Sequence, residues 1–115
     1  MQEIQYDLSN LMEFAAGDEH FIKEMLEFFI KDTPDALNKL KDAVEENDYE
    51  KIYQISHKFS SQLSLVAIEK VSILMNEIEK TALAKTDLGS IQMKVSEATS
   101  ACLYVIDRIK KDYNL

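Results

Sequence analysis

The 115-residue chain has very little of what builds turns, disulfides or unstructured segments. It contains two glycines, one proline, one cysteine and no tryptophan, whereas 46% of its residues are hydrophobic. This composition excludes a disordered chain and a disulfide scaffold. It also leaves few residues for the turns of a many-stranded sheet. We therefore expect one helical domain over residues 1–115, long enough to enclose a single hydrophobic core.

Positive charge is also scarce. The chain has 13 Lys and Arg against 21 Asp and Glu, for a net charge of −8. Nucleic-acid-binding surfaces are basic, and anionic lipid repels an acidic protein, so neither partner is expected. No apolar run approaches the roughly 18 residues of a membrane span, and the N-terminus lacks the regions of a signal peptide. Because a single cysteine cannot form an internal disulfide, we expect a reducing cytoplasm.

Apolar residues recur at three- and four-residue steps in five stretches, as they do in amphipathic helices. The first predicted helix covers residues 7–14 and turns four apolar side chains inward: Leu8, Leu11, Met12 and Ala15. The third begins after the cap Asp48 and ends near residues 65–67, and the fourth covers residues 68–82. Residues 84–90 are the predicted linker to the last helix. On that helix Cys102 lies in the apolar stripe, which indicates a buried hydrophobe.

The second predicted helix contains the only proline. Asp18 can cap it, and Glu19 lies in its first turn, where the helix dipole favours an acid. The apolar stripe stays in phase across Pro34, at positions 25, 29, 37, 40 and 44. This favours one long kinked helix over a second helix capped by Thr33. We interpret the aromatic pair Phe28-Phe29 as part of the core.

Short connections between long helices make neighbouring helices antiparallel. The sequence therefore predicts an all-α fold, an antiparallel up-down-up-down four-helix bundle with a short extra N-terminal helix across one end. We expect a monomer.

The third predicted helix presents a histidine to solvent. Its apolar side chains fall within a sector of roughly 80°, and His57 lies about 160° from the centre of that sector. The sector contains Ile52, Ile55, Phe59, Leu63 and Val66. The residues on the same face as His57 are Glu50, Tyr53, Gln54, Ser61, Ser64 and Leu65. His20 also points outward, but its neighbours indicate only the start of a helix.

The segment His57-Lys58-Phe59-Ser60-Ser61-Gln62 resembles the H-x-L-K-G-S motif of histidine-containing phosphotransfer (HPt) domains. His57 matches the phosphoacceptor, Phe59 the large apolar residue, and Ser61 the small residue four positions on. Two residues depart from the motif, because Ser60 stands where the family has lysine and Ser61 where it has glycine. The resemblance covers residues 7–83 well and the last helix only by its apolar pattern.

The resemblance implies a phosphotransfer intermediate in a two-component phosphorelay, which carries a phosphoryl group on His57 between receiver aspartates. Its expected partners are a response-regulator receiver domain and a hybrid sensor histidine kinase. The receiver supplies the Mg²⁺, and we expect no cofactor on this chain. Nor do we expect kinase activity, because the chain has no Gly-rich phosphate loop. The residues predicted to neighbour the phosphoryl group or to dock the partner are Lys58, Ser61, Gln54, Tyr53, Ser60, Ser64 and Leu65, with Gln62 as a weaker candidate.

Other classes fit the sequence less well. A di-iron bundle uses Glu-x-x-His pairs, but Gln54 and Gly17 occupy the glutamate positions, so no metal site is predicted. Histidine kinase dimerisation domains place an acidic residue after the histidine, where this chain has Lys58. One alternative stays open because of Ser60. An HPt-shaped binding module would dock or sequester a receiver with little or no phosphotransfer.

Overall fold

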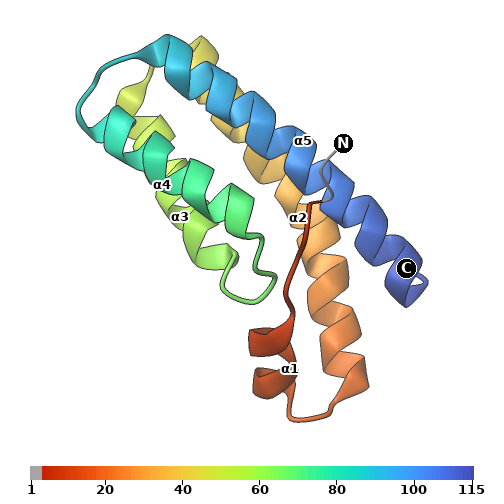
Figure 1. Cartoon of the computed structure of the whole chain (residues 1–115). Helices are drawn as coiled ribbons and strands as arrows, with labels where there is room; N and C mark the ends of the chain where they lie inside the picture. Colours follow the sequence, from red (N-terminus) through yellow and green to blue (C-terminus); the bar gives the residue numbers. More distant parts are fainter. Residues whose placement is uncertain (1–3) are drawn as a thin grey trace.

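The computed structural model describes residues 4–115, which form five helices (Figure 1). These are α1 (Ser9–Ala15), α2 (Glu19–Glu45), α3 (Tyr49–Gln62), α4 (Glu69–Leu83) and α5 (Leu88–Tyr113). Helices α2 and α4 each contact both α3 and α5, so the four long helices form a closed ring, and α1 contacts α2. The predicted all-α four-helix bundle with an extra N-terminal helix is confirmed.

Three aspartates set where three of the four long helices begin. Asp18 accepts a hydrogen bond from the backbone N–H of Phe21, and Asp48 from that of Lys51, each at 3.1 Å. Both predicted caps are confirmed. Asp87 caps α5 in the same way. The predicted linker over residues 84–90 was therefore too long, because α5 already begins at Leu88.

Helix α2 runs unbroken through Pro34. The alternative start at Thr33 is wrong, since Thr33 is buried in mid-helix. A kink at the proline stays a prediction. The prediction that both Phe28 and Phe29 belong to the core was half wrong, because Phe29 is 6% exposed whereas Phe28 is 56% exposed. Adjacent helical residues differ by about 100° in direction, so the core receives only one of the two rings.

The N-terminal segment is partly extended. The backbones of Asp7 and Ala67 pair through hydrogen bonds of 2.8 and 3.0 Å, which tie this segment to the α3–α4 turn. Because the Asp7 carboxylate also accepts from the N–H of Ser9, α1 begins there, two residues later than predicted. Met12 was expected to face inward but is 39% exposed, whereas Leu8, Leu11 and Ala15 are buried.

Helix α3 ends at Gln62, three to five residues earlier than predicted. The backbone N–H of Leu63 completes the last turn by donating to the carbonyl of Phe59. The turn that follows still buries Leu63 and Val66. The apolar spacing therefore continues past Gln62, so it did not indicate where the helix ends.

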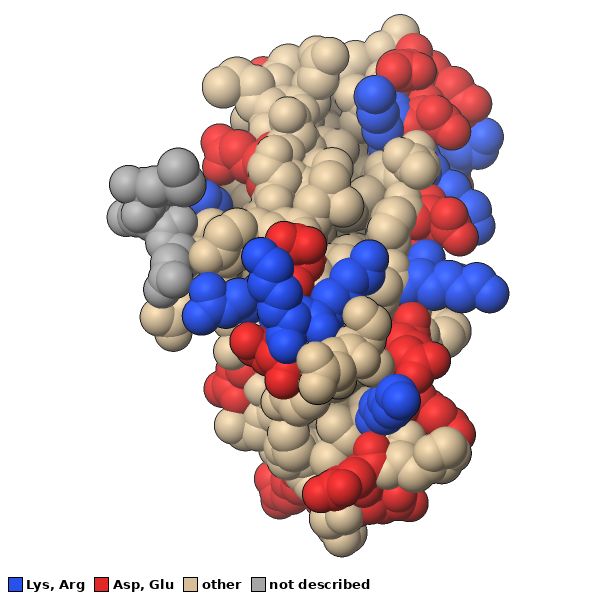
Figure 2. Space-filling model, turned by 90° about the vertical axis from the view of Figure 1, so that its right-hand side faces the viewer, with Lys and Arg blue, Asp and Glu red and all other residues tan. Residues whose placement is uncertain are grey.

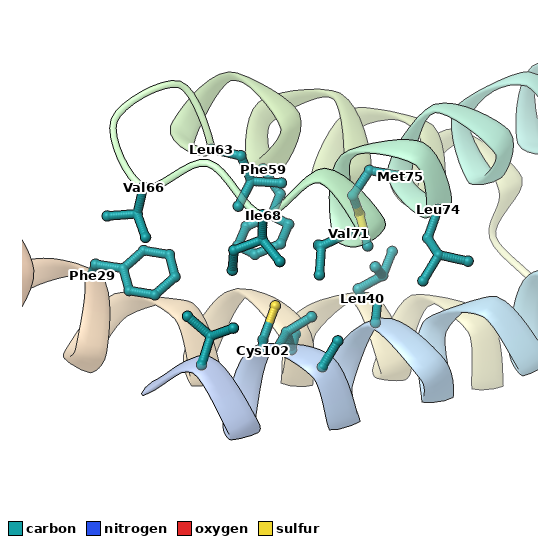
Figure 3. Packing of buried hydrophobic residues seen from close by; sticks show 14 of the residues in the cluster. Phe29, Leu40, Phe59, Leu63, Val66, Ile68, Val71, Leu74, Met75 and Cys102 are labelled. Atoms are coloured by element: carbon teal, nitrogen blue, oxygen red, sulfur yellow. The ribbon is translucent and has the colours of Figure 1, made fainter. Parts of the chain in front are cut away.

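The core lies between the α3–α4 pair and the α2–α5 pair. In Figure 3, Phe59 of α3 and Val71 and Met75 of α4 point toward Leu40 of α2 and Cys102 of α5. Cys102 has no exposed surface, which confirms it as a core residue. This burial raises the pKa of the Cys102 thiol to about 12.

The face over α2 and α5 carries both signs of charge. Figure 2 shows basic and acidic side chains interleaved there. On α5, Lys111 pairs with Asp107 at 3.6 Å, one helical turn apart. None of the helices in residues 4–115 has the length and apolarity that a membrane crossing requires.

Candidate functional site

His57 stands on the outer face of α3, and its side chain is 66% exposed. The opposite face of the helix is fixed in the core by Ile52 and Phe59, which are 0% and 2% exposed. Between them the buried hydroxyl of Ser56 donates to the carbonyl oxygens of Ile52 and Tyr53, at 2.7 and 3.1 Å. The imidazole therefore projects from a firmly packed element, as the sequence predicted.

A glutamate from the neighbouring helix holds the imidazole. Oε1 of Glu79 on α4 lies 2.7 Å from Nδ1 of His57, and the Glu79 side chain is only 14% exposed. An ionised carboxylate can only accept hydrogen bonds, so Nδ1 is the donor. In the neutral ring this leaves the lone pair on Nε2, which has no hydrogen-bond partner among residues 4–115.

Tyr53 lies against the same imidazole. The two ring centroids are 5.8 Å apart and the ring planes differ by 14°. Tyr53 is partly buried and packs against the hydrophobic core. His57 is thus contacted at one edge by Glu79 and on one face by Tyr53.

The predicted polar neighbours differ in what they offer. Lys58 and Gln54 are exposed, and within residues 4–115 Lys58 forms no ion pair. Ser61 is exposed as well, but its hydroxyl donates to the carbonyl of His57 at 3.4 Å. Lys58 and Gln54 therefore offer exposed donor groups on the same helix as His57.

A groove of about 180 Å³ lies between α2 and the end of α3. We call it the α2–α3 groove. It starts one helical turn after His57, at Ser61, and is lined by Met25, Phe28, Phe29, Asp32, Thr33, Ser61, Gln62, Ser64, Leu65 and Val66. Three predicted site residues, Ser61, Ser64 and Leu65, therefore meet there, together with the weaker candidate Gln62. Ser64 and Leu65 reach the groove from the turn after α3 rather than along the helix.

Residues 24–110 match the family model described as Hpt domain, which spans most of the chain and includes α3 and α4 entire. The chain belongs to the Hpt domain family. No curated protein and no solved structure matches it. Family membership gives this Hpt domain a role in histidine phosphotransfer within phosphorelays, with receiver and kinase domains as the kind of partner.

Ser60 occupies the position of the family's lysine in this Hpt domain. Its hydroxyl is buried and finds no hydrogen-bond partner among the described residues. The serine therefore supplies no cation, and its hydroxyl does not reach the solvent side of the helix where His57 stands.

The other histidine has a different setting. His20 is 83% exposed and pairs through Nε2 with Glu24, one turn along the same helix, at 2.6 Å. Its partner is itself 61% exposed, so neither side chain is held by the core. Within residues 4–115, no group of three or more His, Cys, Asp or Glu side chains is arranged to hold a metal ion.

Two residues of the candidate site were not predicted from the sequence. Glu79 lies 22 positions after His57 on another helix, and nothing local to His57 signals the pairing. Phe28 was assigned to the core but lines the α2–α3 groove with more than half of its surface exposed.

Proposed function

We propose that this Hpt domain carries a phosphoryl group on Nε2 of His57 between aspartates of response-regulator receiver domains. The observation that supports this most directly is the hydrogen bond from Nδ1 to Glu79. It leaves the Nε2 lone pair of an exposed ring available to an incoming phosphorus atom.

Phosphoryl transfer from the receiver to His57 requires no proton donor. Nε2 attacks the phosphorus of a receiver aspartyl phosphate, the new N–P bond forms, and the aspartate carboxylate leaves with the electrons of the broken O–P bond. The ring keeps its Nδ1 proton and becomes positively charged, and the Glu79 carboxylate stabilises that charge. In the reverse step a receiver carboxylate attacks phosphorus and neutral imidazole leaves, which is easier than expelling an anion.

The other groups that the reaction needs are supplied by the partner. By family, the receiver brings the aspartate and the Mg²⁺, and a hybrid sensor histidine kinase is the upstream source of phosphate. This chain contributes the ring and the nearby donors Lys58 and Gln54. We expect the relay to run in the cytoplasm, with the Hpt domain as a monomer.

The receiver docks on the α2–α3 groove in this proposal. The groove adjoins the phosphoacceptor helix one turn from His57, and Phe28 and Leu65 give it apolar contact surface. Apolar anchors surrounded by polar residues are the usual basis of such interfaces. A receiver held there would bring its aspartate close to the exposed imidazole.

One observation favours a second function, a module that docks the receiver with little transfer. The buried hydroxyl of Ser60 replaces the cation that the family places near the phosphoryl group. The α2–α3 groove would serve docking alone equally well. The two functions differ only in whether His57 becomes labelled.

The test incubates the chain with a receiver carrying radiolabelled phosphate and Mg²⁺, and follows acid-labile, base-stable label. Wild type and His20→Ala, a matched change at the other exposed histidine, should both take label. His57→Ala should take none yet still bind the receiver. Label on His57→Ala would contradict the assignment of the site, and binding by wild type without label would establish the docking module instead.

A further inference from the structure

The Tyr53 ring contacts the His57 imidazole, and the proposed transfer step does not use this contact. It comes from the same helix, four residues earlier, and lies nearly parallel to the imidazole, with the centroids 5.8 Å apart. Offset parallel rings at this separation attract each other beyond their simple burial. The contact therefore stabilises the imidazole in the orientation that lies against the Tyr53 ring.

Two contacts together restrict the imidazole more than either does alone. The Glu79 carboxylate fixes the Nδ1 edge but still allows the ring to swing about that hydrogen bond. A neighbour on one face opposes this swing. Tyr53 is suited to this task because it packs against the core, and because its carbonyl accepts a hydrogen bond from buried Ser56.

We propose that Tyr53 is a positioning residue for phosphoryl transfer, because its ring and the Glu79 carboxylate hold the His57 imidazole with Nε2 directed at solvent. The inference rests on the proposed function of His57. An oriented nucleophile reacts faster because it has less rotational freedom to lose on the way to the transition state. The tyrosine touches neither phosphate nor partner in this role and acts through the histidine.

The test uses phosphoramidate, a small phosphodonor that needs no docking surface. Tyr53→Ala should lower the initial rate of His57 labelling between about twofold and tenfold, the range expected for one aromatic contact. Tyr53→Phe should label at the wild-type rate because it keeps the ring. Tyr49→Ala is the matched control, since Tyr49 is a partly buried tyrosine one turn earlier on α3 that also packs against the core. Thermal melting of each variant shows whether the fold is intact.

A second measurement does not depend on phosphotransfer. Side-chain NMR relaxation of the His57 ring should report greater motion in Tyr53→Ala than in wild type and Tyr53→Phe. Unchanged ring motion in Tyr53→Ala, or an unchanged labelling rate, would overturn the positioning role. An equal loss in Tyr53→Phe would also overturn it, because the hydroxyl rather than the ring would then matter. Absence of label on wild type after incubation with a phosphorylated receiver and Mg²⁺ would refute the proposed function, and the relaxation data would then decide whether Tyr53 orients the ring.

Discussion

The Glu79 carboxylate accepts a hydrogen bond from Nδ1 of His57 at 2.7 Å, across the α3–α4 interface. The two side chains differ sharply in exposure, at 14% for the glutamate and 66% for the histidine. The Glu79 carboxylate is therefore largely enclosed between the helices, whereas the His57 ring is accessible to a partner. In the proposed transfer step, this relationship leaves Nε2 of an exposed histidine as the nucleophile.

Removing the charge of Glu79 should slow phosphotransfer. In Glu79→Gln the amide oxygen can still accept from Nδ1, but it no longer stabilises the positive ring that forms on phosphorylation. We expect a rate about tenfold to a hundredfold lower, by analogy with the loss seen when the carboxylate partner of a metal-bound histidine is removed. Initial labelling rates from phosphoramidate measure this without a docking step.

The matched control is Glu77→Gln on the same helix, since Glu77 pairs instead with Lys94 of α5 at 2.9 Å. That variant should label at the wild-type rate. If Glu79→Gln also labelled at the wild-type rate, the carboxylate would have no role in the reaction.

Restoring the lysine at position 60 should lengthen the life of the phosphorylated state. A lysine stem can run along the helix surface and bring its ammonium group toward the phosphoryl oxygens of His57. An exposed ion pair between this ammonium group and the phosphoryl group should increase the half-life of phosphorylated His57 about two- to fivefold. Ser60→Lys is compared with Ser60→Met, which has a similar length and no charge. Equal half-lives in the two variants would show that charge at this position is irrelevant.

Truncating Phe28 should weaken receiver binding and leave the reactivity of the histidine intact. Because 56% of its surface is exposed in the α2–α3 groove, Phe28→Ala removes apolar contact without opening the core. We expect the Kd for a receiver to rise about tenfold, as for an aromatic anchor, while labelling by phosphoramidate is unchanged. Met93→Ala on α5, where the side chain is 68% exposed, is the control. Equal binding by the two variants would place the interface elsewhere.

The thiol of Cys102 should make the stability fall at alkaline pH. Burial raises its pKa from 9.0 to about 12, so above pH 9 the unfolded chain loses this proton while the folded chain keeps it. The stabilisation is complete below pH 9 and is lost as the pH rises toward 12. Between pH 8 and 10, the unfolding free energy should decrease by about 1 kcal/mol more in wild type than in Cys102→Ala. Urea titrations at the two pH values measure this difference, and parallel decreases would contradict it.

The sequence predicted the bundle because its signals are local. Aspartates at positions 18 and 48 cap helices through their own third neighbours, and the apolar spacing shows which face of each helix is buried. The exposure of His57 followed from the same spacing.

The features that the sequence did not predict depend on how the helices pack against one another. The pairing of His57 with Glu79 requires the register of α3 against α4, and no spacing within either helix specifies that register. Phe28 was misplaced because its spacing matches the apolar stripe, although 56% of its surface is exposed. The end of α3 was missed because the turn after Gln62 is as apolar as the helix and lies on the same core.

The most direct test of the account is the position of the phosphoryl group itself. The chain, labelled with ¹⁵N in histidine, is phosphorylated by a receiver with Mg²⁺ and examined by NMR for coupling between ¹⁵N and ³¹P. We predict a single phosphorylated nitrogen, Nε2 of His57, with the proton still on Nδ1. Phosphate on Nδ1 of His57, on His20 or on no histidine would contradict the account.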